Sequence, residues 1–126
     1  MTDAPAPELW YLASPYSKFY FGIESAAQMI CKIAGKLIRS GESVFSPIAH
    51  SHIIAHVSGI DPLDHDFWME CDKAYMHHCT GLIVVMMPGW TKSKGMRMEI
   101  EAFKKAGKPI RWYDPETDLF VSEVLN

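Results

Sequence analysis

The sequence has little of what several classes of protein require. Its three cysteines, Cys31, Cys71 and Cys79, show no C-x-x-C spacing, so neither a zinc site nor a disulfide framework is indicated, and a reducing, cytoplasmic location fits best. No segment approaches the roughly 20 apolar residues of a transmembrane helix. Twelve Lys and Arg against 15 Asp and Glu argue against the broad basic surface that nucleic-acid binding needs. Residues 1–8 lack the parts of a signal peptide and are expected to form a flexible tail.

Residues 9–126 fit one compact domain, because a chain of 126 residues that is 48% hydrophobic can bury one core. Short apolar runs alternate with segments of helical periodicity. The apolar runs are 9–13, 43–45, 82–87 and 109–113, and the helical segments are 24–39, 48–57, 64–79 and 95–106. This alternation predicts an α/β three-layer sandwich, flavodoxin-like or Rossmann-like, around a four- to five-stranded parallel sheet. In such a sheet, the loops after the first and third strands are expected to meet at the ligand-binding edge.

The segment 86–100 carries the strongest candidate for a ligand site. A hydrophobic strand ends there in a Gly-containing loop, and the free N–H groups of the helix that follows attract anions. We place Glu99 in the first turn of that helix, where N–H donors and nearby cations keep it ionised, as a nucleophile requires. Alternatively, Ser93 is only an N-cap and Glu99 only a surface acid that complements the helix dipole. The nearby cations are Lys92, Lys94 and Arg97.

Asp72 stands out among the acids of the 64–79 helix, because it lies on the apolar face of that helix. Aromatic and methionine side chains flank it one turn on either side. They are Trp68, Met69, Tyr75 and Met76. A carboxyl group held among such side chains tends to have a raised pKa, which suits a proton donor. The alternative is an acid that caps or pairs locally at the surface.

Metal binding is indicated only weakly. His50, His52 and His56 form an H-x-H-x-x-x-H pattern in which only His52 and His56 share a helical face, and no carboxylate sits at ligand spacing. We therefore expect neither a metal site nor an organic cofactor.

Several short motifs, taken in order, resemble the nucleoside 2-deoxyribosyltransferase superfamily over nearly the whole chain. They are Tyr11-Leu12-Ala13-Ser14-Pro15-Tyr16-Ser17, Val44-Phe45-Ser46-Pro47, Asp72, Ser93-x-Gly95-x-x-x-Glu99 and Gly107-Lys108-Pro109. The chain is especially similar to a small bacterial branch that carries the Pro-Gly-Trp loop and Ser-x-Gly. The resemblance implies that Glu99 attacks the anomeric carbon to give a glycosyl-enzyme, and that Asp72 handles the proton on the base. It also implies a homodimer or larger homo-oligomer in which a neighbouring subunit completes the pocket, and the segment ending in Leu125-Asn126 is the part expected to reach across.

Ser93 departs from the deoxyribosyltransferases that act on free nucleosides, which commonly carry an acid at this position to bind the sugar 5′-hydroxyl. Related nucleoside 5′-monophosphate N-glycosidases resemble this chain in having serine. A hydroxyl beside helix N–H groups can donate to a phosphate, which a carboxylate would repel. The Arg-containing first loop of those hydrolases is absent here. The expected phosphate contacts are Ser14, Ser17, Lys18, Ser93 and Gly95, and Tyr16, Trp68 and Trp90 are candidates to sandwich a base.

The sequence therefore predicts cleavage of the N-glycosidic bond of a nucleoside or deoxynucleoside 5′-monophosphate, through a glycosyl-enzyme and with retention at the anomeric carbon. One alternative is a 2-deoxyribosyltransferase that exchanges bases on free nucleosides. Another is a non-catalytic nucleotide-binding protein in which Glu99 contacts only the sugar hydroxyls. Whether the Glu99 and Asp72 carboxyl groups face one cleft distinguishes a catalyst from a binding protein.

Overall fold

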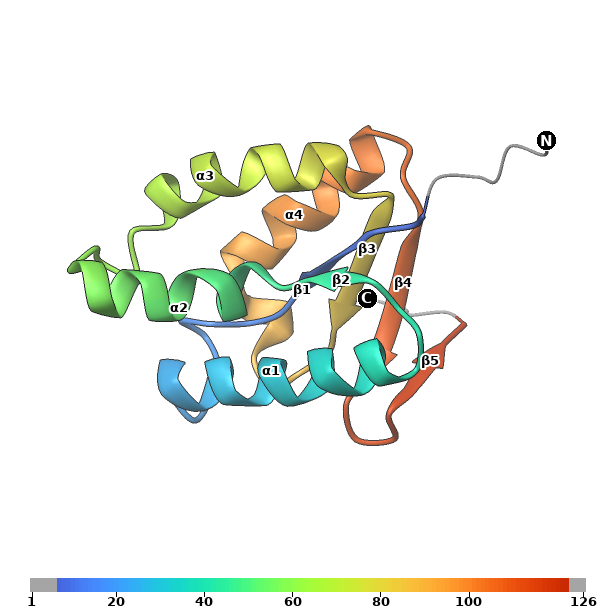
Figure 1. Ribbon diagram of the computed structural model, residues 1–126, viewed down its shortest axis with the longest axis horizontal. Coiled ribbons are helices and arrows are strands. Elements are labelled where there is room, and N and C mark those ends of the chain that lie inside the picture. The colour runs from blue at the N-terminus through green and yellow to red at the C-terminus, as the bar shows by residue number, and fades with distance from the viewer. Residues whose placement is uncertain (1–6, 123–126) are drawn as a thin grey trace.

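The computed structural model describes residues 7–122, and it contains one mixed sheet covered by helices (Figure 1). Most of the expected tail at residues 1–8, and the segment ending in Leu125-Asn126, lie outside the described residues. The strands are β1 (Trp10–Ala13), β2 (Val44–Phe45), β3 (Gly81–Val85), β4 (Ile110–Asp114) and β5 (Leu119–Val121). The helices are α1 (Ile23–Arg39), α2 (Pro47–Ser58), α3 (His65–His78) and α4 (Lys94–Lys105), with a short 3₁₀ turn, η1 (Trp90–Lys92), before α4.

The strands lie in the order β2-β1-β3-β4-β5. The first four are parallel, which confirms the predicted α/β architecture, but β5 pairs antiparallel with β4. The expectation of an all-parallel sheet is therefore wrong for the fifth strand. Arg111 of β4 stacks between Trp10 and Phe120, with its guanidinium carbon 4.8 and 3.9 Å from the two ring centroids. This contact ties β5 to the rest of the sheet.

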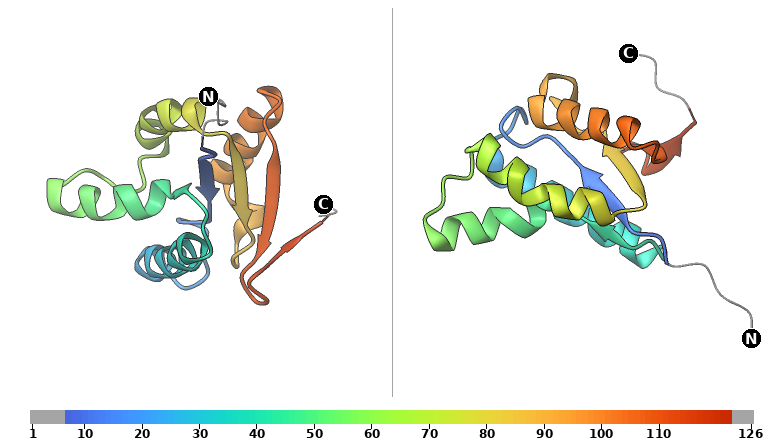
Figure 2. Two further views of the ribbon diagram at one scale, coloured as in Figure 1. Left: turned by 45° about the vertical axis from the view of Figure 1, so that its right-hand side comes forward. Right: turned by 90° about the horizontal axis from the view of Figure 1, so that it is seen from above.

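Alternate side chains of β1 point into two separate cores. Trp10 and Leu12 join the core beneath α1, whereas Tyr11 and Ala13 join the core beneath α3 and α4. In Figure 1, α3 lies above the strands and α1 below them, and Figure 2 shows α4 beside α3. Between these layers β1 and β3 are fully buried. The loops at their carboxyl ends emerge from the centre of the sheet.

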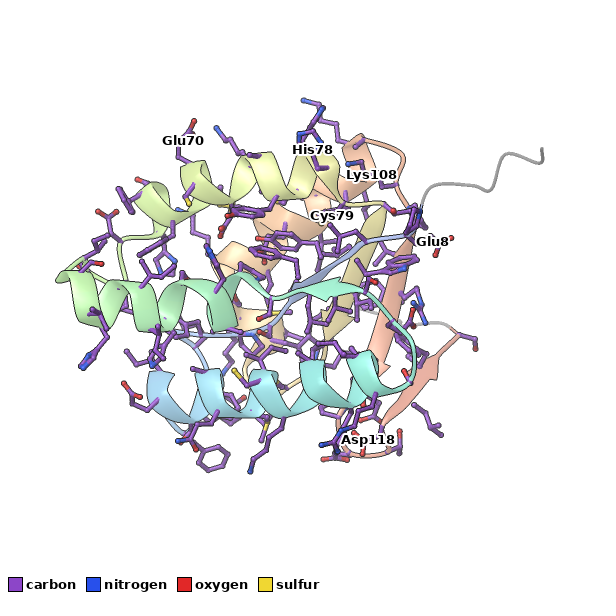
Figure 3. All side chains as sticks on the ribbon, viewed as in Figure 1. Glu8, Glu70, His78, Cys79, Lys108 and Asp118 are labelled. Atoms are coloured by element: carbon purple, nitrogen blue, oxygen red, sulfur yellow. The ribbon has the colours of Figure 1, made fainter. Side chains whose placement is uncertain are left out.

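Side chains fix the ends of the helices that reach these loops. Ser46, Asp64 and Ser93 cap α2, α3 and α4 by accepting a backbone N–H at 3.0, 3.3 and 3.2 Å. At the other end of α3, the Lys108 ammonium donates to the carbonyls of Met76 and His77, next to His78 (Figure 3). No helix within residues 7–122 has the length and apolar character to cross a membrane.

The loops after β1 and β3 touch, as the sequence predicts, because the two strands are neighbours. The contact is at Gly89, which has φ +92°, and a Cβ built there would lie 2.0 Å from the Lys18 carbonyl oxygen. Only glycine permits both this backbone conformation and this approach. The two loops therefore form one edge of the cleft described next.

Candidate active site

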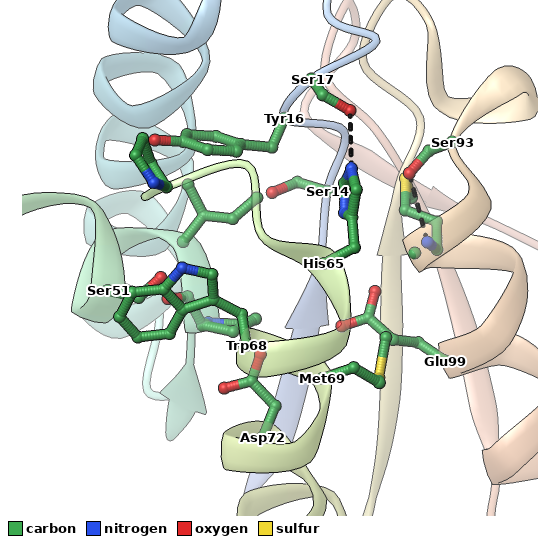
Figure 4. A pocket seen from close by; sticks show the side chains of 15 residues that line it. Ser14, Tyr16, Ser17, Ser51, His65, Trp68, Met69, Asp72, Ser93 and Glu99 are labelled. Atoms are coloured by element: carbon green, nitrogen blue, oxygen red, sulfur yellow. Dashed lines mark hydrogen bonds between the residues drawn. The ribbon is translucent and has the colours of Figure 1, made fainter. Parts of the chain in front are cut away.

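A cleft opens at the carboxyl ends of β1 and β3 and encloses about 610 Å³, part of it open to solvent (Figure 4). Side chains from the loop after β1, from α2, from α3 and from the start of α4 line it. Eight of the ten predicted site residues lie there: Ser14, Tyr16, Ser17, Trp68, Asp72, Ser93, Gly95 and Glu99.

Glu99 lies on the buried side of α4, where only 7% of its surface is exposed. Because Ser93 is the N-cap, Glu99 is the sixth residue of α4 and lies in its second turn rather than its first. Burial, together with the charge of Asp72, raises the pKa of Glu99 to about 8, against the opposing effect of Tyr11. The expectation that Glu99 stays ionised near neutral pH is therefore wrong, since desolvation outweighs the distant helix terminus and the exposed cations.

Asp72 faces the same cleft from α3, and 8% of its surface is exposed. Burial raises the pKa of Asp72 to about 6, as its apolar surroundings predict, and Tyr11 again acts in the opposite direction. Its Oδ1 atom is buried and has no hydrogen-bond partner among the described residues. An unpaired buried carboxyl oxygen is costly, so it indicates a place for a ligand's hydrogen-bond donor.

Tyr11 belongs to the site, although the sequence analysis assigns no role to it beyond its place in the Tyr11–Ser17 motif. Its ring is fully buried beneath α3 and α4, and its hydroxyl makes no hydrogen bond of good geometry with a described residue. The hydroxyl nevertheless lies close enough to both carboxyl groups to favour the ionised form of each, and burial, together with their charges, raises the pKa of Tyr11. A neutral phenol thus adjoins the two acids. In the sequence, Tyr11 is indistinguishable from the other apolar residues of its strand.

The serines of the cleft supply hydroxyl groups at its other end. Ser93 Oγ accepts from the Met96 amide at 3.2 Å, which leaves its own O–H free to donate to a ligand. Ser14 Oγ is buried and has no hydrogen-bond partner within residues 7–122, and Ser17 Oγ lies 3.4 Å from His65 Nε2. These hydroxyl groups, with the first amides of α4, can bind hydroxyl or phosphate oxygens.

Two predicted substrate residues lie outside the cleft. The Lys18 side chain is exposed, and the Lys18 backbone carbonyl lies next to Gly89. Trp90 is half-buried against the core beneath α4, with its ring centroid 6.0 Å from that of Trp112, and it does not line the cleft. None of the described residues that line the cleft is lysine or arginine. The cations expected around the site, Lys92, Lys94 and Arg97, are exposed and do not line it.

Two aromatic rings line the cleft, those of Tyr16 and Trp68. Trp68 is held by its indole N–H, which donates to the Asp61 carbonyl at 2.9 Å. Tyr16 is held by its hydroxyl, which bonds His52 Nδ1 at 2.5 Å. Rings fixed at their polar ends offer their apolar surfaces to a planar group such as a base.

The histidines of α2 are not arranged as metal ligands. His50 packs against Phe45 and Tyr75, whereas His52 bonds Tyr16 and Glu24. Within residues 7–122, no group of three or more His, Cys, Asp or Glu side chains is placed to hold a metal ion.

Comparison with known proteins gives one finding about the chain. A family model described as "Domain of unknown function (DUF1937)" matches residues 8–115, which include the whole cleft. No curated protein matches the chain.

Proposed function

Since the chain belongs to the DUF1937 family of unknown function, we propose an activity from its site and its sequence motifs: cleavage of the N-glycosidic bond of a nucleoside 5′-monophosphate. One observation carries the proposal. Two buried carboxyl groups, from α3 and α4, line a single cleft and have raised pKa values of about 6 and 8. Between these values the pair holds one proton, mainly on Glu99, and a minor form with the proton on Asp72 instead provides one nucleophile and one acid. The motifs shared with the nucleoside 2-deoxyribosyltransferases point to the same bond.

In the proposed reaction, Glu99 attacks the anomeric carbon as its bond to the base breaks. The electron pair of that bond leaves with the base, which takes the proton held by Asp72. Water then cleaves the sugar ester of Glu99 and returns a proton to Asp72, so both groups recover their starting states. The reactive form has Glu99 ionised and Asp72 protonated. The positive charge that develops on the sugar favours that form, because it stabilises a carboxylate next to it.

We also propose that the fold belongs to the flavodoxin-like class. Its strand order is that of a flavodoxin-like sheet, and the cleft lies where β1 and β3 are neighbours and the winding direction changes. The antiparallel β5 departs from that pattern.

Transfer between free nucleosides is the second candidate, and one observation favours it. The cleft contains two acids and no lysine or arginine among its described lining residues, which suits a neutral sugar better than a phosphate dianion. Ser93 and the start of α4 favour the phosphate instead.

A panel of nucleosides and nucleoside 5′-monophosphates tests the proposal. Purified protein is incubated with each compound, and released base is measured by chromatography. Release from a monophosphate supports the proposal, and exchange of bases between free nucleosides supports the second candidate. Binding without either reaction would contradict both and leave a nucleotide-binding protein.

The rate of base release should depend on pH as a bell centred near pH 7. The pKa values are about 6 for Asp72 and about 8 for Glu99. Below the lower value both carboxyl groups are protonated, so the pair has no nucleophile. Above the upper value both are ionised, so the pair has no acid. The measurement is kcat/KM from pH 4.5 to 9.5. The variant Asp72→Asn should retain a single ionisation. A profile that is flat from pH 5 to 9 would contradict the assignment.

Replacing Ser93 by aspartate should reverse the preference between phosphorylated and free substrate. A carboxylate at the start of α4 repels a phosphate, whereas it can accept a hydrogen bond from a 5′-hydroxyl. Charge-assisted hydrogen bonds are worth about 1.5–3 kcal/mol, so we expect monophosphate binding to weaken about 10- to 100-fold. Calorimetric titration of both ligands into wild type and Ser93→Asp measures this. Asp is itself a good N-cap, so the helix should keep its start, and an unchanged preference would exclude phosphate binding here.

A further inference from the structure

A chain of hydrogen bonds leads from the wall of the cleft to the surface. The Tyr16 hydroxyl bonds His52 Nδ1 at 2.5 Å, and His52 Nε2 lies 3.1 Å from a Glu24 carboxylate oxygen. The three residues come from the loop after β1, from α2 and from α1. Only Tyr16 lines the cleft, so His52 and Glu24 lie behind its wall.

The chemistry of the three groups fixes the direction of this chain. A carboxylate can only accept, so Glu24 selects the tautomer of His52 that carries its proton on Nε2. His52 Nδ1 is then an acceptor, and it takes the proton of the Tyr16 hydroxyl. Burial and the charge of Glu24 both raise the pKa of Tyr16, which keeps this hydroxyl protonated and able to donate. Each donor therefore meets one acceptor along the chain.

We propose that His52 and Glu24 are positioning residues, which act through the Tyr16 hydroxyl to hold its ring in one orientation as a wall of the cleft. The ring of His52 also meets that of Tyr16 edge to face, with centroids 5.6 Å apart and planes at 79°. The His52 side chain is 13% exposed and that of Glu24 is 75% exposed. The bond between Tyr16 and His52 is thus the sheltered one, and Glu24 supports it from the surface.

This inference rests on the proposed function in one respect: the Tyr16 ring is taken to contact the base of the substrate. A fixed ring binds a planar base without first losing its own rotational freedom. The contact is similar in the ground state and the transition state, so losing it raises KM and leaves kcat nearly unchanged. That pattern separates positioning from a role of Tyr16 in the chemical step.

The first test needs no substrate. Three-bond couplings across χ1, measured by NMR on ¹³C,¹⁵N-labelled protein, report how many rotamers the Tyr16 side chain occupies. We expect one rotamer in the wild type and averaging between rotamers in His52→Ala. Glu24→Ala, at the exposed end, should cause partial averaging without endangering the fold. His56→Ala is the matched control, because His56 is exposed one turn further along α2 and makes no hydrogen bond with a described residue. A single rotamer in His52→Ala would overturn the inference.

The second test uses the four common deoxynucleosides and their 5′-monophosphates as substrates. Both His52→Ala and Tyr16→Phe should raise KM about 5- to 10-fold with kcat within about twofold, as expected for one lost hydrogen bond. The double variant should be no worse than either single variant, because both remove the same bond. His52→Asn keeps an acceptor near the position of Nδ1 and should restore part of the loss.

The two tests can contradict the proposed function and the positioning role independently of each other. If the wild type releases no base from any of the eight compounds, the proposed function fails, and the NMR couplings still decide the role of His52 and Glu24. If base is released but His52→Ala has the KM of the wild type, the positioning role is overturned and the proposed function stands.

Discussion

Replacing Glu99 by glutamine should abolish base release and make the fold more stable at high pH. Glutamine has nearly the same size as glutamate but cannot attack the anomeric carbon, so turnover should fall by about 10³-fold or more. Loss of function through a damaged fold would predict the opposite change in stability. The two effects together therefore identify a buried acid that is kept for its chemistry.

The sign of the stability change follows from the pKa of Glu99, which burial raises from 4.5 to about 8. Between these values the folded protein binds more protons than the unfolded chain, so stability falls as pH rises through this window. Glutamine removes that loss. At pH 9 we expect Glu99→Gln to exceed the wild type by about 2–5 kcal/mol in its free energy of unfolding, with little difference at pH 4.

Urea unfolding at pH 4, 7 and 9, combined with the base-release assay, measures both effects. Glu101→Gln is the matched control, because Glu101 is exposed on the same helix and does not line the cleft. It should change neither turnover nor the dependence of stability on pH. Base release like that of the wild type in Glu99→Gln would exclude Glu99 as the nucleophile, and an unchanged dependence of stability on pH would contradict its raised pKa.

Replacing Gly89 by alanine should destabilise the protein by about 3 kcal/mol or more. The added Cβ would lie 2.0 Å from the Lys18 carbonyl oxygen, and a residue with a side chain rarely adopts φ +92°. The obstacle is backbone, which cannot rotate aside, so the two loops must separate. Because those loops carry Ser14 and Ser93, ligand binding should weaken as well.

Gly107→Ala provides the control for the backbone conformation alone. Gly107 has φ +69°, and a Cβ there would meet nothing within 4 Å. It should lose only about 1–2 kcal/mol, the usual cost of a left-handed residue with a side chain. Thermal and urea unfolding of the two variants give the comparison. Equal losses would show that the contact between the loops can relax.

Most of the fold could be predicted because its elements are buried or strongly periodic. The apolar positions of α1 recur at helical spacing, and β1 and β3 are uninterrupted apolar runs. The strand β5 could not be predicted, since Leu119 and Phe120 are exposed and its three residues depend on pairing with β4. The Arg111 side chain that stacks on Phe120 also stacks on Trp10, which is distant in the sequence, and local patterns do not report such contacts.

The site was partly predictable for the same reason. Asp72 interrupts an apolar helical face, and that pattern alone placed it in the interior. The raised pKa of Glu99 depends on the packing of α3 against α4, which no local pattern reports. The position of Glu99 in the second turn depends on the residue at which α4 begins. The role of Tyr11 depends on its hydroxyl lying beside both acids, which only the folded sheet brings about.

The two edges of the sheet have a consequence for how copies of this protein can meet. The strand β2 has only two residues, and Pro47 follows soon after without an N–H to offer. At the opposite edge β5 has three residues. Edges this short give a second chain little backbone to pair with, so edge-to-edge growth of the kind that leads to fibres is disfavoured. We therefore expect a homo-oligomer of this chain to form through contacts between side chains more than through pairing of edge strands.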